Sequence, residues 1–336
     1  MIESKLLEYK ELRNSLSDKS RLKRGKVYLP KFFLEHGSYY ELLGVIKEVK
    51  PVVEINFHDK FIGDFNQAVK ELEDCYGLKY KLGDYKFLID SFNDSSSVAK
   101  IDDSREGLMS ASISFDKGKA EKSEELFLEK SKSGISSNEN SHEFAKLMGY
   151  PECCVEFTKK LKGGKVSRED REKNLLWSKI DIRAYMESKK FSRLLNVFTI
   201  NPLIPHSPCH LNCSESKKYA QEMLDVFRGE DERFEGVINY FLDLSAIYWH
   251  YSEKFLLEGE KNGNTFHYTD FLEFSYSNKK FYGGAEEEFN KKMKKTKKLL
   301  KKGDTIVMKD DHFQIKNSKE VLGKIEKEYK NACILV

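Results

Sequence analysis

Four of the six cysteines of this 336-residue chain fall in two tight groups. Cys153 and Cys154 are adjacent in Gly-Tyr-Pro-Glu-Cys-Cys, and Cys209 and Cys213 are separated by three residues in Pro-Cys-His-Leu-Asn-Cys. Deprotonated cysteines are the ligands of soft metal ions and of iron–sulfur clusters. Clustered cysteines in a chain that is expected to stay in the cytoplasm more often bind metal than form disulfides. We therefore predict that both groups bind one metal ion or cluster.

Each cysteine group lies where a helix is predicted to begin. Pro151 suits a first helical position, where its missing N–H is not needed, and apolar residues follow at helical spacing through Leu161. Asn212 or Ser214 can cap a second helix over residues 215–227. The free N–H groups and the positive dipole end at a helix start lower the pKa of a thiol. This placement favours thiolates at both groups.

The residue types leave the cofactor open. An iron–sulfur cluster is the favoured interpretation, because side chains of adjacent helical residues diverge by about 100° and a cluster tolerates that divergence better than one small ion. Zinc is the alternative, since the Cys-x3-Cys group has the spacing of structural zinc sites. In a further alternative, either Cys153 or Cys154 is a reactive thiol beside the cofactor. The pair can also be a dithiol or a vicinal disulfide, or all four can be buried apolar residues.

Histidines and acids near the cysteines are further candidates. His206 ranks first as an additional metal ligand or proton carrier, because two prolines stiffen its loop, and His142 and His210 follow. Glu152 and Glu156 lie one turn apart on the cysteine helix and offer proton donors or carboxylate ligands, but a solvated helix face is the favoured interpretation.

Composition excludes several classes of protein. Charged residues make up 34% of the chain, above the about 25% typical of globular proteins, and the net charge is only +3. No segment approaches the ~18 apolar residues of a membrane span, and the charged N-terminus lacks the apolar core of a signal peptide. We therefore expect a cytoplasmic protein without a membrane partner. The chain has no Walker motif, no dinucleotide fingerprint and no His-Glu-x-x-His.

The pattern of apolar residues predicts an α+β fold. We expect an N-terminal mixed α/β domain over residues 1–135, and the small polar residues 131–141 suggest the boundary. A domain over residues 141–336 follows, with a mainly helical core that contains the cysteines and with C-terminal β-hairpins. A strand over 197–204 is predicted to deliver the second cysteine group, and a helix over 318–331 is predicted to end the chain.

A lysine-rich helix is predicted over Glu286–Lys302. Met293, Thr296 and Leu300 fall on one stripe at helical spacing, and most of the remaining face is cationic. The stretch Lys291–Lys302 therefore suits RNA phosphates or an acidic partner, although a solvated amphipathic helix is the simpler interpretation.

The segments 142–154 and 205–216 resemble the domain of unknown function 483 family of archaea and bacteria. This chain and the members of that family share a Gly-Tyr-Pro-x-Cys-Cys group and a later Pro-His-x-Pro-Cys-x3-Cys group. The likeness covers roughly residues 142–225. The resemblance implies that the four cysteines belong together, and it assigns no reaction.

The leading hypothesis is a cytoplasmic metal- or iron–sulfur-binding enzyme, an oxidoreductase or transferase with redox or sulfur-type chemistry and an unknown substrate. The alternative is a structural-zinc protein that binds RNA or an acidic partner through its lysine-rich helix.

Overall fold

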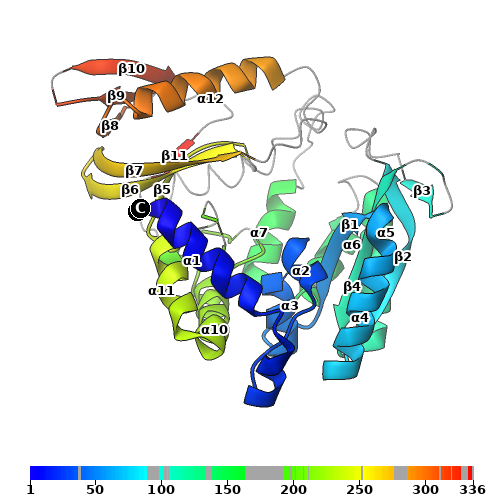
Figure 1. The fold of residues 1–336 in the computed structure, drawn as a ribbon. Helices are drawn as coiled ribbons and strands as arrows, with labels where there is room; N and C mark the ends of the chain where they lie inside the picture. The colour runs from blue at the N-terminus through cyan, green and yellow to red at the C-terminus, as the bar shows by residue number, and fades with distance from the viewer. Residues whose placement is uncertain are drawn as a thin grey trace.

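The computed structural model describes residues 1–36, 39–88, 98–101, 104, 106–132, 138–162, 192–196, 199–200, 202–206, 208–210, 212–250, 253–275, 286–309, 312–318, 320–326 and 332–334. Helices and strands are both abundant and the strands form two separate antiparallel sheets, so the fold is α+β, as predicted. Figure 1 shows the smaller sheet on the right, the larger sheet at the upper left, and helices between and below them.

The smaller sheet has the order β1-β4-β2-β3. Its central strand β4 is buried on both faces because its side chains alternate between two helix layers. Met109, Ala111 and Ile113 belong to the core that also contains the buried residues of α4, while Ser110 and Ser112 hydrogen-bond Glu124 of α5. The elements are β1 (Val53–His58), α4 (Ile62–Tyr76), β2 (Lys79–Leu88), β3 (Val98–Lys100), β4 (Gly107–Ser114) and α5 (Lys117–Lys132).

The main hydrophobic core extends across the predicted boundary between the two domains. It contains Ile2 of α1 and Leu72 of α4, and equally Phe227 of α10 and Phe241 of α11. The ring of Phe241 meets Tyr9 of α1 edge to face at 5.8 Å. The division into residues 1–135 and 141–336 therefore stays a prediction. The elements are α1 (Ile2–Ser15), α2 (Lys31–Glu35), α3 (Tyr39–Ile46), α6 (Asn138–Leu147), α7 (Glu152–Lys162), α10 (Ser214–Glu230) and α11 (Glu232–Leu242), with 3-10 turns Lys19–Arg24, Asp59–Phe61 and Arg193–Leu195.

The larger sheet has the order β10-β9-β8-β7-β6-β5-β11 and is covered by α12. The predicted hairpins are present: β6 turns into β7 at Gly263, whose φ of 59° needs glycine, and β8 pairs with β9. Met293 and Leu300 of α12 enter a second core with the sheet, as the predicted stripe requires. The elements are β5 (Ser245–His250), β6 (Glu253–Asn262), β7 (Thr265–Ser275), α12 (Glu286–Leu300), β8 (Thr305–Met308), β9 (His312–Lys316), β10 (Val321–Glu326) and β11 (Ala332–Ile334).

Two predicted elements are wrong. Where the structure describes the predicted final helix over 318–331, Val321–Glu326 form strand β10 instead, because pairing with β9 outweighs the helix propensity of Lys324 and Glu326. Residues 319 and 327–331 lie outside the described residues. The described residues within 197–204 form bends and no strand, and Thr199 Oγ1 donates to the carbonyl of Phe241 near the end of α11. The mainly helical character expected after α7 falls on residues 163–191, which lie outside the described residues.

None of the described helices is both long and apolar enough to cross a membrane.

Candidate metal centre

The first cysteine pair is positioned by a sharp turn between α6 and α7. Gly149 ends α6 with φ of 78°, and its N–H donates to the carbonyl of Lys146. The carbonyl of Pro151 then accepts the N–H groups of Cys154 and Val155 at 2.9 and 3.0 Å. Pro151 thus directly precedes the first residue of α7 rather than occupying that position. Both cysteines fall in the first turn of α7, where the N–H of Cys154 is bonded to the carbonyl of Pro151, the residue before the helix.

The second pair lies on a loop and on the start of α10. Cys213 itself precedes the helix, in place of the expected cap residues Asn212 and Ser214, and its carbonyl accepts the N–H of Lys217. Cys209 lies earlier on the same loop, and its N–H donates to the sulfur of Cys154 at 3.3 Å. The two segments are therefore joined by a backbone hydrogen bond to a ligand atom.

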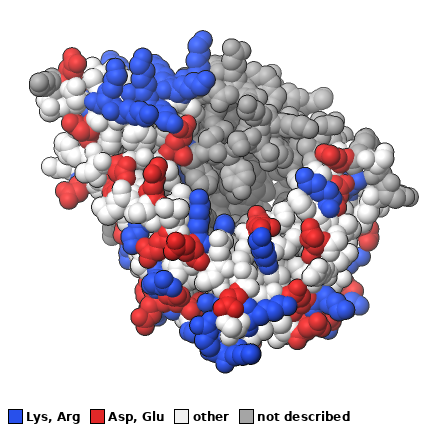
Figure 2. All heavy atoms as spheres, viewed as in Figure 1, with Lys and Arg blue, Asp and Glu red and all other residues white. Residues whose placement is uncertain are grey.

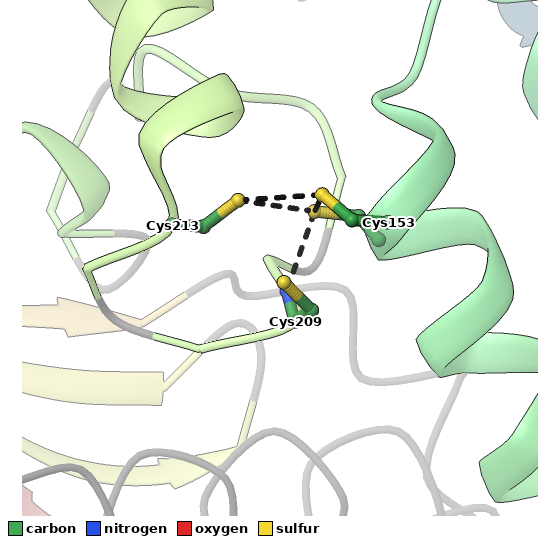
Figure 3. A group of neighbouring side chains, drawn as sticks. Cys153, Cys209 and Cys213 are labelled. Carbon is green, nitrogen blue, oxygen red and sulfur yellow. Dashed lines mark hydrogen bonds between the residues drawn. The ribbon is translucent and has the colours of Figure 1, made fainter.

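The four sulfurs lie around one point, and the predicted convergence is confirmed. Cys153 and Cys154 are 3.8 Å apart between sulfurs, and Cys213 lies 3.6 and 3.7 Å from them. All four sulfurs, including that of Cys209, lie within 4.8 Å of one another. Figure 3 shows Cys153, Cys209 and Cys213 turned toward a common space between α7 and the loop before α10. All four are free thiols, so the vicinal disulfide is absent from this structure.

Ser216 contacts the cysteine group through its hydroxyl. Its hydroxyl lies 3.2 Å from the sulfur of Cys154 and 2.9 Å from Nε2 of His206, and the residue is fully buried. A single hydroxyl hydrogen can serve only one partner. If Ser216 donates to the thiolate, His206 must donate through Nε2–H, and its buried Nδ1 then has no hydrogen-bond partner among the described residues. Sequence reasoning missed the role of Ser216, whose local signal is its place in the first turn of α10.

His206 therefore lies beside the four sulfurs and not among them. Its ring packs against Tyr150 at 5.2 Å and Tyr219 at 5.9 Å between centroids. Burial, helped by the nearby ammonium of Lys50, lowers the pKa of His206 to about 3, so the imidazole is neutral near neutral pH. The hydrogen bond between Nε2 of His206 and the hydroxyl of Ser216 indicates that His206 positions Ser216. The role of His206 as a metal ligand stays a prediction.

The thiols have unequal proton affinities. Burial raises the pKa of Cys213, but the hydroxyl and N–H of Ser216 and the thiols of Cys153 and Cys209 outweigh it and lower the value to about 7. Burial raises the pKa of Cys209 to about 12, and it raises that of Cys154 well above its ordinary range. Cys213 thus has a lower pKa than Cys154 and Cys209, and a bound cation would have to displace protons from these two neighbours.

A second group of side chains gathers on the outer side of α6 and α7. Nε2 of His142 lies 3.5 Å from Glu156 and 3.8 Å from Glu152, and these three can also approach a cation. However, the ammonium of Lys146 already lies 2.9 Å from Glu152, and both carboxylates are well exposed. This group has the character of a surface ion-pair network. His210, the remaining candidate, is exposed, and its Nδ1 accepts the N–H of Asn212.

The lysine-rich helix differs from the cysteine group in its chemistry, because its described exposed side chains offer positive charge and no metal-binding thiol or carboxylate. Between residues 291 and 302 every exposed position is a lysine, and no described residue of this stretch is acidic. Lys297 is paired with Glu273 of β7. Figure 2 shows the cationic side chains gathered at the upper left, where α12 lies in Figure 1. The exposed positions are Lys291, Lys294, Lys295, Lys298, Lys301 and Lys302.

No family model, no curated protein and no solved structure matches this chain.

Proposed function

We propose that Cys153, Cys154, Cys209 and Cys213 together bind one metal ion, and that the ion is zinc. The observation that carries this proposal is the spacing of the sulfurs. Four sulfurs bonded at ~2.3 Å to a tetrahedral ion lie ~3.8 Å from one another. The three distances among Cys153, Cys154 and Cys213 are 3.6 to 3.8 Å.

The same spacing makes an iron–sulfur cluster the less favoured cofactor. A cluster places several iron and sulfide atoms between its thiolates, so its sulfurs lie farther apart than those around one ion. The four sulfurs here all lie within 4.8 Å of one another. The divergence of adjacent helical side chains, which favoured a cluster, does not keep the sulfurs of Cys153 and Cys154 apart. Both sulfurs can turn toward Cys213 from the first turn of α7. An iron–sulfur cluster remains the alternative cofactor, and metal analysis can distinguish it from zinc.

The surroundings of the sulfurs also support a bound cation. Four thiolates in a partly buried space repel one another strongly unless a cation neutralises them. The N–H of Cys209 and the hydroxyl of Ser216 direct hydrogen bonds at Cys154, as the outer-shell donors of metal ligands do. These donors stabilise the thiolate form that a metal requires.

Metal analysis of the full chain tests the proposal. The protein is purified without a polyhistidine tag, and zinc, iron and acid-labile sulfide are measured with the absorption spectrum. We expect a colourless protein with one zinc per chain, and a variant with Cys209 and Cys213 both changed to serine that binds none. Stoichiometric iron with sulfide would replace zinc by a cluster. Absence of any metal after growth in metal-rich medium would overturn the proposed site.

A second candidate function is the binding of RNA by the lysine face, which we define as the six exposed lysines of residues 291–302. Lysines elsewhere commonly face an acid, as Lys79 does Glu73 at 2.6 Å and Lys31 does Glu35 at 3.1 Å. Within the described part of the chain, none of the six forms an ion pair. Unpaired like charges on one helix face repel one another, and a polyanion relieves that repulsion.

Salt dependence tests this second candidate. Binding to single-stranded RNA should weaken steeply with salt, with a logarithmic slope near −4 if all six lysines release counterions. Changing Lys291, Lys294, Lys295 and Lys298 to glutamine should reduce the slope by about 3. A control with the same charge change removes four paired lysines, namely Lys5, Lys31, Lys79 and Lys117. No binding at low salt, or equal loss in both variants, leaves the lysine face a solvated surface.

A further inference from the structure

Cys153 differs from the other three cysteines in exposure. Its side chain is exposed, whereas Cys154 and Cys213 are each only 2% exposed and Cys209 is partly buried. The difference arises because adjacent residues of α7 point in different directions, so that one faces the core and the other the surface. A reagent in solution therefore reaches the sulfur of Cys153 before those of Cys154 and Cys213.

Cys153 also differs in its hydrogen bonds. The sulfur of Cys154 lies within hydrogen-bond distance of the N–H of Cys209 and of the hydroxyl of Ser216. Cys213 is stabilised by the backbone N–H of Ser216. Among the described residues, the sulfur of Cys153 contacts only other thiols of the group.

Hydrogen bonds decide how reactive a metal-bound thiolate is. A donor that points at the sulfur stabilises its negative charge and lowers its nucleophilicity. Four thiolates around one divalent ion carry two excess negative charges, and the donors at Cys154 and Cys213 offset this charge on the buried side. Among the described residues, neither Cys153 nor Cys209 receives such a donor, so both thiolates should be more nucleophilic than those of Cys154 and Cys213. Exposure then selects Cys153, because Cys209 is partly buried.

We propose that the metal-bound sulfur of Cys153 is a nucleophile that takes an alkyl group from a small carbon electrophile. A lone pair of the thiolate forms a bond to a saturated carbon, and the bond from that carbon to its leaving group breaks with both electrons. The products are an S-alkyl cysteine and the released anion, and no oxidant or reductant is needed. The sulfur becomes a neutral thioether, so the charge of the centre falls from −2 to −1. This inference rests on the proposed metal site.

The arrangement allows this step without loss of the fold. Cys154, Cys209 and Cys213 supply three ligands from both segments, so the link between α7 and the start of α10 persists when Cys153 becomes a weak thioether ligand. Metal sites that react commonly have three strong protein ligands and a fourth position that can change. Cys153 occupies that position.

Alkylation of the metal-loaded full chain tests the inference. The background is removed by changing the two cysteines outside the group, Cys75→Ser and Cys333→Ser. Cys75 is a partly buried free thiol on α4, and Cys333 lies in β11. Metal content is measured first, and the protein is then treated with limiting iodoacetamide or methyl iodide. Peptide mass spectrometry follows the adduct at each cysteine, and native mass spectrometry records whether the metal is still bound.

We expect Cys153 to be alkylated at least about tenfold faster than each of the other three, with both reagents and with the metal retained. Cys153→Ser should still bind metal and should resist alkylation. Equal modification of the four cysteines, or modification only after the metal has left, would overturn the nucleophile. A chain that carries no metal at the outset overturns the proposed site instead, so the two failures are distinguishable.

Discussion

The N–H of Cys209 donates to the sulfur of Cys154 at 3.3 Å, and this bond links two segments that are 55 residues apart in the sequence. The donor is fixed by the loop before α10, and the acceptor by the first turn of α7. A backbone donor survives any change of side chain except one to proline, so the position of the loop determines the environment of the sulfur. The buried sulfur of Cys154 therefore connects the two cysteine groups through this hydrogen bond.

The first prediction concerns the adjacent cysteines, which should respond differently to substitution. Cys154→Ser replaces a buried sulfur that contacts Cys213, Ser216 and the N–H of Cys209, so it should abolish metal binding and lower the melting temperature. Cys153→Ser changes an exposed side chain and should retain the fold and most of the metal. Metal content and thermal melting of both variants check this. Equal losses would mean that both members of the pair are purely structural ligands.

The second prediction concerns the hydroxyl of Ser216. Ser216→Ala removes the donor to Cys154 and leaves the ring nitrogen of His206 without its partner. We expect a loss of about 1–3 kcal/mol in the free energy of unfolding and about 10–100-fold weaker metal binding. Competition with a chelator of known affinity measures the second effect. Ser214→Ala, on the exposed side of the same helix turn, is the matched control and should change neither quantity.

The third prediction concerns the turn before the first cysteine pair. Gly149 has a positive φ, and a Cβ at this position would lie 2.7 Å from Cδ of Pro51. Gly149→Ala should cost about 2 kcal/mol or more, because a left-handed conformation and a steric clash add together, and it should weaken metal binding by displacing α7. Denaturant unfolding and metal titration test both effects. Gly229→Ala in α10, where no atom lies within 4 Å, should instead leave stability unchanged or raise it slightly.

The fourth prediction concerns the buried carboxylate of Glu230 and the pH dependence of stability. Arg21 lies 2.8 Å and Lys47 2.9 Å from its oxygens, and the N–H of Val27 also donates to it. Burial favours the protonated form, but these partners outweigh it and hold the pKa of Glu230 below its usual value of 4.5. The carboxylate therefore stabilises the fold above pH 4.5, and this contribution is lost as the pH falls below that value.

Glu230→Gln should accordingly cost about 3 kcal/mol at neutral pH, since it leaves the buried Arg21 without its counterion. Between pH 5 and pH 3 the variant should lose less stability than the parent protein. Denaturant midpoints across this pH range measure the difference. Parallel pH profiles for the two proteins would contradict the assignment of this acid sensitivity to Glu230.

The convergence of the cysteines was predictable because their spacing carries the information. Two cysteine pairs, each at a predicted helix start, suggested that the four sulfurs meet at one site. Both helix starts are present in the structure. The single-ion spacing was not predictable, since it depends on side-chain rotamers and on how closely α7 approaches the loop at Cys209. His206 shows the same limit: its type suggested a ligand, but only the fold reveals that Ser216 lies between it and Cys154.

Strand β10 shows where local sequence misleads. Its Lys and Glu residues favour a helix, and only the partner strand β9, supplied from elsewhere in the fold, makes it extended. One local signal was available in Gly323. A Cβ there would lie 2.8 Å from Leu299 of α12, so the glycine permits the helix to pack closely on the sheet.

The 60 residues that separate Cys153 from Cys213 affect how the protein is made. A ribosome that adds ~5–20 residues per second needs about 3–12 s to synthesise this stretch. During that interval the Cys-Cys pair of α7 exists without the second half of its site, and no metal can yet be bound by all four sulfurs. At the proposed site, metal insertion would therefore be a late step of biogenesis, with two adjacent thiols kept reduced on an unfinished chain until it occurs.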